Sequence, residues 1–445
     1  MTERTPEEQS AAVSERTRRD EEIRLRWQWV ELAIWTPRML AALEQGVKGG
    51  NWYSLMDKVY KVENLTSGFR KVEANKGSAG VDHVTVEMFG DRWIENLQHL
   101  SEQLASGQYR PQPIRRVWIP KPGTKEMRPL GIPTVRDRVV QAALRNAIEP
   151  IFEREFAAQS YGFRPGRGCK DALRRVDGLL KAGYEWIVDV DLKSYFDTIP
   201  HEQLLARIRE RVADSKVLDL ITAFLKQGVM GGLAGWTPET GTPQGAVISP
   251  LLSNIYLNPL DHQMANRGTE MVRYADDLVL VCRSQAEAEE ALAVLTAWVT
   301  KSGLQLHPTK TRIVHTDDPG GFEFLGYHFV RGRRWPRKKS LTKLKDSVRA
   351  NTKRTDGRSL SAIIKTLNPT LRGWYQYFKH CYRTTFRNID RWVRGRLRSI
   401  LRRRAGRRGR GRGEDHHRWP NAFFRKQGLY SLVTAHAQEC RSSPR

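Results

Sequence analysis

Apolar and polar residues alternate in several short stretches of the first 330 residues, a pattern typical of half-buried β-strands. Residues 115–133 are predicted to form strand, turn and strand, because Val117 and Ile119 alternate with polar neighbours and Pro122-Gly123 supplies a turn. Further strands are predicted at 186–192, 271–274, 278–281 and 322–330. Helical spacing predicts helices at 136–152, 203–212, 217–228 and 286–302. This order indicates an α+β domain with an antiparallel sheet and helices on one face.

The pattern changes near residue 341 and becomes helical. Apolar residues recur every three to four positions from Ile363 to Phe378, and Pro369 is expected to divide this stretch into two helices. Residues 391–412 then contain eleven arginines and no acidic residue, and the glycines in the later half predict a flexible segment. Residues 1–50 carry apolar spacing that predicts one or two further helices.

The charge of the chain is concentrated at one end. Lys and Arg number 75 against 49 Asp and Glu, a net charge of +26 over 445 residues. Residues 331–412 hold 28 basic and three acidic residues, whereas the first 330 residues are nearly neutral. Such a block indicates a polyanionic partner, and nucleic acid is favoured over an anionic membrane surface. No apolar run is long enough to span a membrane, and the polar start is unlike a secretion signal, so a cytoplasmic protein is expected.

Carboxylates gather at the ends of two predicted strands. Asp276 and Asp277 occupy the turn between the strands 271–274 and 278–281, and taken alone they could form an ordinary solvated turn. The strand at 186–192 brings Asp189 and Asp191 onto one face, and Asp197 follows it. If this strand lies beside the turn, the carboxylates converge and offer the oxygen ligands that Mg²⁺ prefers. Spacing alone does not choose among the three carboxylates of the 186–197 stretch.

Four sequence blocks carry a resemblance to a known family. They are KGSAGVD at 76–82, SYGFRPGRGCKDA at 160–172, GTPQGAVISPLLSNIYL at 241–257 and YADD at 274–277. In this order they resemble the motifs of reverse transcriptases, above all the reverse transcriptase and splicing maturase proteins encoded within bacterial group II introns. Residues 341–400, with RGWY at 372–375, resemble the thumb or maturase domain of those proteins.

The resemblance implies a right-hand polymerase fold. Fingers and a palm with an antiparallel sheet would be followed by an α-helical thumb and maturase domain. The expected domains are a helical N-terminal extension at 1–50, fingers at 51–160, palm at 161–335, thumb and maturase domain at 336–400, and a basic nucleic-acid-binding tail at 401–445. No H-N-H endonuclease domain is expected, because Cys440 is solitary and no cysteine pairs follow the arginine run.

The resemblance also assigns roles to single residues. The family pattern D-x-K-x-x-F-D selects Asp191, which with Asp276 and Asp277 would hold two Mg²⁺ ions as the catalytic and metal-binding set. Phe196 would lie beneath the sugar of the incoming nucleotide and exclude a 2′-OH, the alternative being core packing. The other nucleotide-binding residues implied are Gln244 against the nucleotide, Lys121 and Arg128 on the triphosphate, where simple solvation is the alternative, and Lys310 as the proton donor to pyrophosphate.

The implied function is RNA-directed DNA polymerisation, combined with help in splicing a group II intron and with mobility of the intron as a ribonucleoprotein. The partners would be intron RNA or an RNA template, a DNA primer or target, and dNTPs, with no membrane and with association with the nucleoid when DNA is bound. The arginines expected to bind nucleic acid are Arg372, Arg394, Arg398, Arg402, Arg403, Arg404, Arg407 and Arg408. Two alternatives stay open: a related reverse transcriptase serving phage defence, CRISPR spacer acquisition or DNA repair, and a non-catalytic RNA chaperone.

Overall fold

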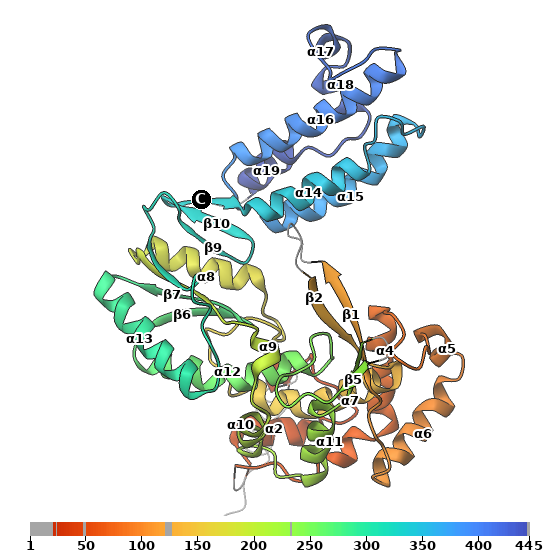
Figure 1. Ribbon diagram of the computed structural model, residues 1–445, viewed down its shortest axis with the longest axis vertical. Helices are drawn as coiled ribbons and strands as arrows, with labels where there is room; N and C mark the ends of the chain where they lie inside the picture. Colours follow the sequence, from red (N-terminus) through yellow and green to blue (C-terminus); the bar gives the residue numbers. More distant parts are fainter. Residues whose placement is uncertain (1–20, 24, 48–49, 121–126, 232–233, 443–445) are drawn as a thin grey trace, which may run out of the picture.

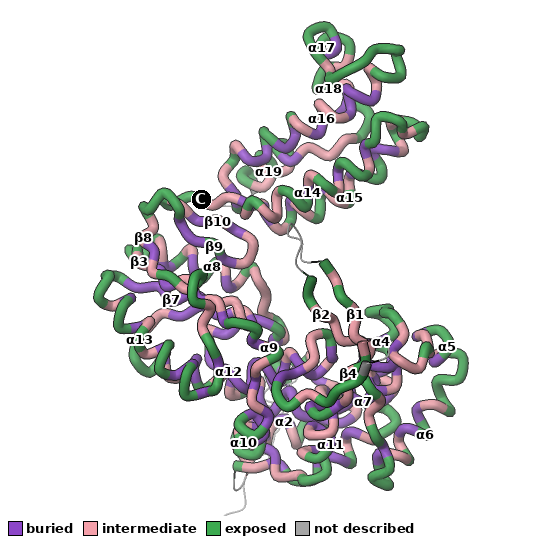
Figure 2. The backbone as a smooth tube through the Cα atoms, in the orientation of Figure 1, coloured by how far each residue is buried: buried purple, intermediate pink, exposed green. Residues whose placement is uncertain are grey.

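The protein is a curved molecule of three parts, seen in a computed structural model that describes residues 21–442 except 24, 48–49, 121–126 and 232–233. Figure 1 shows a largely helical N-terminal part at the lower right, a part built on β-sheets at the left, and a helical C-terminal part at the top. Figure 2 shows that the buried segments run through the interior of each part. Lys121 lies outside the described residues.

The N-terminal part is organised around the central helix α7 (Val135–Glu153), which is buried on nearly all sides. Thr134 caps this helix by accepting a hydrogen bond from the Asp137 amide, as N-cap threonines do. Strands β1 (Ile114–Pro120) and β2 (Met127–Ile132) pair antiparallel, which confirms the two strands predicted there, whereas the predicted turn at Pro122-Gly123 lies outside the described residues. The helices around α7 are α2 (Pro37–Gln45), α3 (Met56–Val59), α4 (Val62–Asn75), α5 (Val86–Gly90) and α6 (Trp93–Ala105).

The central sheet has the strand order β6-β7-β3-β8, with every neighbouring pair antiparallel. Its strands are β3 (Trp186–Asp191), β6 (Glu270–Tyr274), β7 (Asp277–Cys282) and β8 (Arg312–His315). Val188 and Leu280 face one core, covered by α12 (Ser249–Asn266) and α13 (Gln285–Lys301). Ile187 and Val281 face a second core, covered by α8 (Cys169–Lys181). The prediction of helices on one face was therefore wrong, because both sides of these strands are apolar and both need cover.

The remaining elements of this part connect the sheets. Strands β4 (Val229–Gly231) and β5 (Ala234–Trp236) extend the sheet of the N-terminal part, in the order β2-β1-β4-β5. The predicted helices at 203–212 and 217–228 correspond to α10 (His201–Arg209) and α11 (Ser215–Leu225), and the short α9 (Tyr195–Thr198) precedes them.

Residues 322–330 form a hairpin rather than the single strand predicted. Strands β9 (Phe322–Phe324) and β10 (Tyr327–Val330) are joined by Leu325 and Gly326, both with positive φ, and β11 (Arg333–Pro336) completes the sheet. Two such residues form the tight turn typical of two-residue hairpins. The aromatic residues of both strands are buried: Phe322, Phe324, Tyr327 and Phe329. The sequence therefore reads as one continuous apolar strand and gives no sign of the turn.

The C-terminal part is helical. Its helices are α14 (Lys338–Ala350), α15 (Leu360–Phe378), α16 (Thr384–Arg404), α17 (Glu414–Arg418), α18 (Asn421–Lys426) and α19 (Leu432–Ser442). Pro369 lies inside the continuous helix α15, so the predicted break does not occur. Because Leu367 and Leu371, on either side of the proline, are both fully buried in the same core, packing outweighs the loss of one backbone hydrogen bond.

The arginine-rich stretch is partly helical and partly held by a buried carboxylate. Helix α16 continues to Arg404, past residue 400. Beyond it, Asp415 accepts hydrogen bonds from the Arg412 amide at 2.9 Å and from Arg402 Nη1 at 2.6 Å, which fixes a segment predicted to be flexible. Among the residues that the structure describes, no helix combines the length and the apolar character needed to cross a membrane.

Candidate active site

Three carboxylates meet at one end of the central sheet. In the register of β3 and β7, Asp191 lies opposite Asp277. Tyr274 pairs with Asp277 across β6 and β7, so Ala275 and Asp276 form a two-residue loop in which Ala275 has a φ of 59°. The hairpin predicted from the sequence is thus confirmed, and the strand at 186–191 lies directly beside it.

The carboxylates line a cavity of about 1140 Å³. Asp189, Asp191, Asp276 and Asp277 all contribute to it, whereas Asp197 lines a different cavity. The opposite charge comes from three parts of the chain, through Arg128, Lys310, Arg312, Arg337, Lys338 and Lys339. A space lined by both acidic and basic groups can hold both a cation and a polyphosphate.

Crowding of the carboxylates changes their proton affinity. Burial and then the charge of Asp276 raise the pKa of Asp277 to about 7. Burial and then the charge of Asp191 raise the pKa of Asp276. Burial raises the pKa of Asp189 to about 6, although Arg312 opposes the shift. Carboxylates that disfavour one another's negative charge gain stability when a cation is added to the cluster.

The oxygen atoms of these carboxylates are the kind of ligand that a hard divalent cation needs. As oriented here, no three His, Cys, Asp or Glu side chains within the described residues form a metal-binding group. Asp191 instead forms an ion pair with Lys310, whose Nζ lies 3.0 Å from Asp191 Oδ2. The Asp191 side chain is 39% exposed. Because every donor in the cluster is a carboxylate oxygen, the residues fit a hard cation such as Mg²⁺.

A buried charge network supports the hairpin, and no sequence pattern predicted it. Arg273 is fully buried in β6, and its guanidinium forms a salt bridge with Asp261, which is also fully buried. It donates to the carbonyl oxygen of Ala275 at 2.9 Å, to Asn254 Oδ1 at 3.0 Å and to Ser160 Oγ at 2.8 Å. The network therefore fixes the backbone immediately before Asp276.

Residues 159–162 form the outer support of the same hairpin. The Arg273 amide donates to the carbonyl of Gln159 at 3.0 Å, and the Tyr161 amide donates to the carbonyl of Arg273 at 2.8 Å. A Cβ atom on Gly162 would lie 2.3 Å from the Ala275 nitrogen. Only glycine allows the SYGF block to approach the hairpin this closely.

Comparison with known proteins agrees with this geometry. The family profile "Reverse transcriptase (RNA-dependent DNA polymerase)" matches residues 119–329, and "Group II intron, maturase-specific domain" matches residues 341–419. Protein YkfC of Escherichia coli (strain K12) is 36% identical over 320 residues, which cover 63% of this chain and 83% of YkfC. The chain belongs to the group II intron-encoded reverse transcriptase and maturase family.

Two other relatives are longer than this chain. Group II intron-encoded protein LtrA of Lactococcus lactis subsp. cremoris is 38% identical over 211 residues, covering 47% of this chain and 34% of LtrA. A 91 kDa protein in the cob intron of Schizosaccharomyces pombe is 30% identical over 282 residues, covering 50% of this chain and 35% of that protein. The chain therefore spans most of YkfC and about a third of these two relatives.

Family membership names the parts of the molecule. The chain has the reverse transcriptase fold, in which the helical part around α7 with β1 and β2 is the fingers and the central sheet is the palm. The helical C-terminal part is matched by the maturase-specific profile over residues 341–419, and it is referred to below as the thumb, the name that the family resemblance gives to this region. Members of the reverse transcriptase family use divalent metal ions, act on RNA and DNA, and catalyse RNA-directed DNA polymerisation.

The predicted nucleotide-binding residues divide between two cavities. Arg128 and Lys310 line the carboxylate cavity. Gln244 lines a neighbouring cavity of about 510 Å³ between the fingers sheet and the palm, where its carbonyl accepts from the Gly131 amide at 2.7 Å. Phe196 is half-buried, with its ring edge-to-face on Tyr195 at 5.4 Å. The basic residues at 337–339 were counted in the charge of the thumb, but no sequence motif assigned them to the active site.

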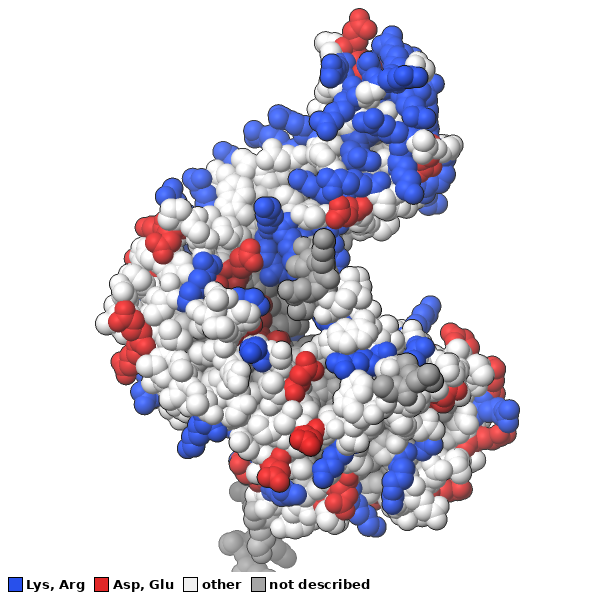
Figure 3. Space-filling view, viewed as in Figure 1, with Lys and Arg blue, Asp and Glu red and all other residues white. Residues whose placement is uncertain are grey.

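The predicted nucleic-acid-binding arginines also differ in their surroundings. Arg372, Arg403, Arg404, Arg407 and Arg408 are exposed. Figure 3 shows Lys and Arg gathered over the end of the thumb that lies at the top of the view.

The other three arginines are half-buried or buried and contact other parts of the thumb. Arg394 pairs with Asp390 at 3.7 Å, and Arg402 pairs with the buried Asp415. Arg398 is only 3% exposed and donates to the carbonyl of Trp419 at 2.9 Å, so it joins α16 to the following segment instead of making the nucleic-acid contact predicted from the sequence.

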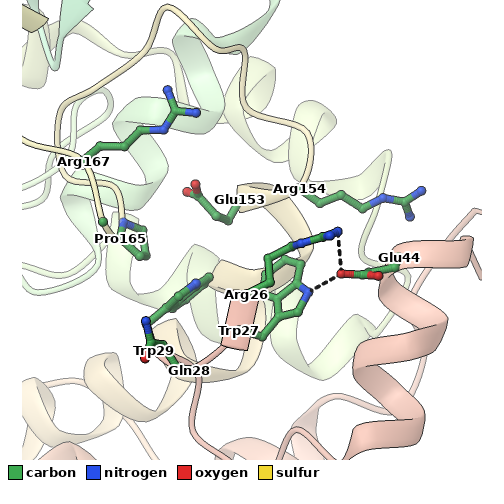
Figure 4. A pocket seen from close by; sticks show the side chains of 10 residues that line it. Arg26, Trp27, Gln28, Trp29, Glu44, Glu153, Arg154, Pro165 and Arg167 are labelled. Carbon is green, nitrogen blue, oxygen red and sulfur yellow. Dashed lines mark hydrogen bonds and ion pairs between the residues drawn. The ribbon is translucent and has the colours of Figure 1, made fainter. Parts of the chain in front are cut away.

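A further cavity of about 560 Å³ lies where the N-terminal segment meets the SYGF block (Figure 4). Arg26 and Trp27 both donate to Glu44 Oε1, at 2.9 and 3.1 Å, and Pro165 and Arg167 line the other side. It shares no lining residue with the carboxylate cavity.

Proposed function

We propose that Asp191, Asp276 and Asp277 hold two Mg²⁺ ions at which this reverse transcriptase joins dNTPs to a primer on an RNA template. The observation that carries the proposal is the register of β3 and β7, which sets Asp191 opposite Asp277 beside the loop that bears Asp276. When bound, the two ions would supply charge neutralisation at the attacking and departing oxygens.

The side chains around the carboxylates would position the nucleotide. Arg128 from the fingers and the basic residues of 337–339 would bind the triphosphate oxygens. The primer 3′-oxygen attacks the α-phosphorus, the bond to the bridging oxygen breaks, and pyrophosphate leaves. Lys310 would donate a proton to that leaving group, since its ammonium already lies in the cavity at 3.0 Å from Asp191. Phe196 and Gln244 would contact the nucleotide from the palm.

The thumb and its arginines would bind RNA through phosphates. This proposal covers intron RNA during splicing, and a DNA primer or target during mobility of the intron as a ribonucleoprotein. It includes a cytoplasmic location, with association with the nucleoid when DNA is bound. The support is the concentration of exposed arginine at 403–412 together with the maturase profile over 341–419.

Primer extension on an RNA template tests the metal-binding assignment. The variant Asp276→Asn with Asp277→Asn should lose more than about 100-fold in extension rate, since even the partners of metal ligands contribute 10- to 100-fold. Asp219→Asn is the control, because the same Asp-to-Asn substitution is made there at a single exposed aspartate on α11, away from the cavity. Normal extension by the double variant would overturn the assignment, and retained RNA binding shows that the variant is folded.

A further inference from the structure

The turn between β9 and β10 lies at the edge of the active site. Strand β9 packs on β3 and β7, the strands whose ends carry the carboxylates. The turn consists of Leu325 and Gly326. Glu323, just before the turn, and Arg337, just after β11, both line the carboxylate cavity together with Asp277. The small sheet of β9, β10 and β11 therefore forms part of the rim of this cavity.

The thumb holds this turn from the other side. The hydroxyl of Tyr377, near the end of α15, donates to the carbonyl of Leu325 at 2.8 Å. The Arg337 amide donates to the carbonyl of Gly326, also at 2.8 Å. In return, the hydroxyl of Tyr327 on β10 donates to the carbonyl of Tyr377. Two tyrosines thus exchange hydrogen bonds between the hairpin and α15, so the hairpin and the end of this helix are joined in both directions.

Leu325 is the residue of this turn that contacts the carboxylates. Its φ is 46°, a left-handed conformation that is unfavourable for a leucine and that persists only where the surroundings hold it. Burial and then the charge of Asp276 raise the pKa of Asp277, and a hydrogen bond from the Leu325 amide opposes this rise. Leu325 therefore accepts a hydrogen bond from the thumb through its carbonyl and donates one to Asp277 through its amide.

The Tyr377 hydroxyl also lies beside the hairpin that carries the aspartates. Burial and then a hydrogen bond with Cys169, the first residue of α8, raise the pKa of Tyr274 to about 12. Burial and then the charge of the same thiol raise the pKa of Tyr377, and the charges of Tyr274 and Asp277 add to this rise. Tyr274 lies opposite Asp277 in the register of β6 and β7. A hydroxyl group of the thumb is therefore close to both strands of the hairpin.

We propose that Tyr377 is a positioning residue through which the thumb fixes Asp277 in the orientation that binds a divalent cation. The proposal rests on the metal-binding function proposed above. Tyr377 holds Leu325 in its left-handed conformation, and the Leu325 amide then holds one oxygen of the Asp277 carboxylate and leaves the other for the cation. Groups that orient a metal ligand in this way contribute about 10- to 100-fold to metal affinity. A movement of α15 would remove the restraint, so the affinity for the cation depends on the position of the thumb.

Binding of Mn²⁺ to the full-length protein tests this proposal, with free Mn²⁺ measured by electron paramagnetic resonance in the absence of nucleic acid. The variant Tyr377→Phe keeps the ring and removes only the hydroxyl. It should weaken Mn²⁺ binding about 10-fold, the lower end of the range for groups that orient a metal ligand. The Mg²⁺ concentration for half-maximal primer extension should rise by the same factor, and saturating Mg²⁺ should restore the wild-type rate. Loss of structural support alone would change neither of these quantities.

Tyr375→Phe is the matched control, because this hydroxyl of the same helix donates to Glu439 Oε2 at 3.1 Å, within the thumb. It should leave the Mn²⁺ affinity unchanged, and both variants should bind a primer–template duplex without divalent ions as the wild type does. Equal Mn²⁺ affinities of the two variants would overturn the proposal. Weaker duplex binding by Tyr377→Phe, with wild-type Mn²⁺ affinity, would also overturn it. Failure of the proposed metal-binding function is distinct, since the wild type and the variant Asp276→Asn with Asp277→Asn would then bind Mn²⁺ equally.

Discussion

Arg273 and Asp261 form a salt bridge in which both side chains are fully buried beneath the hairpin that carries Asp276 and Asp277. Charges are removed from water at high cost, and here the cost is offset by hydrogen bonds to Asn254, Ser160 and the carbonyl of Ala275. The last of these contacts ties the network to the residue before Asp276. Stability and catalytic geometry therefore depend on the same guanidinium.

Breaking this pair should be strongly destabilising. Arg273→Met leaves Asp261 charged and without its partner, which should lower the free energy of unfolding by about 3 to 5 kcal/mol. Urea unfolding measures the change. In the double variant with Asp261→Leu much of this stability should return, but primer extension should remain slow because the Ala275 carbonyl has lost its donor. A single variant that unfolds within about 1 kcal/mol of the wild type would contradict the role of the pair.

Gly162 should be required for activity more than for stability. A Cβ atom at this position meets backbone atoms of Tyr274 and Ala275 at 2.8 and 2.3 Å, so Gly162→Ala must displace the hairpin. We expect the extension rate to fall at least about 10-fold, as measured by single-nucleotide addition. Gly178→Ala is the control, because no atom lies within 4 Å of its Cβ position inside α8, and it should stabilise the helix by up to about 1 kcal/mol. Equal activity of the two variants would refute the steric argument.

Phe196 should determine the choice of sugar. Its ring rests on Tyr195, which is 2% exposed and donates to the carbonyl of Ser253 at 2.8 Å, so the ring has a rigid support. Phe196→Val should raise incorporation of rNTPs relative to dNTPs by about 10- to 200-fold, the range for small changes of side-chain volume in a pocket. Competition between the two nucleotide classes measures the ratio. Phe196→Tyr keeps the ring and should keep the selection; an unchanged ratio in the valine variant would leave Phe196 as a packing residue.

The arginines of the thumb should separate into two groups when they are neutralised. Arg398→Gln removes donors to Trp419 and Asn421, and should destabilise the protein by about 1 to 3 kcal/mol through the buried groups left unpaired. Arg403→Gln with Arg408→Gln changes exposed residues, and should leave the unfolding temperature unchanged while it lowers the salt slope of RNA binding by about 1.4 to 1.8. Thermal unfolding and salt titration of RNA affinity measure the two effects. A destabilised Arg403/Arg408 variant, or an Arg398 variant with wild-type stability and a lower salt slope, would contradict this division into structural and RNA-binding arginines.

The hairpin that carries Asp276 and Asp277 was predictable because its signals are local. Apolar alternation on both sides of residues 275–276 gives the two strands, and the charged turn between them marks the site. The convergence with Asp191 is a long-range pairing, and it followed from the family resemblance together with the face shared by Asp189 and Asp191. Here the sequence pattern and the sheet register agree.

Other features depend on tertiary contacts that no local pattern reveals. Arg273 in the strand EMVRY resembles an exposed residue of a half-buried strand, and its partner Asp261 lies twelve residues earlier on α12. The same holds for Pro369, because the helix continues through the proline where residues on both sides of it are buried in one core. It holds also for Arg398, because the segment at 419–421 that its side chain binds folds back onto α16.

The two-residue loop of Ala275 and Asp276 has a consequence for how this chain can vary. Side chains of β7 alternate between two cores, so inserting or deleting one residue in the loop would exchange the inward and outward positions of the whole strand. Asp277 would then leave the cavity, and Leu280 would lose its place against α12 and α13 at the same time. Two requirements therefore limit the length of this loop: Asp277 must face the cavity, and the apolar side chains of β7 must face their own cores. Insertion or deletion of one residue would violate both.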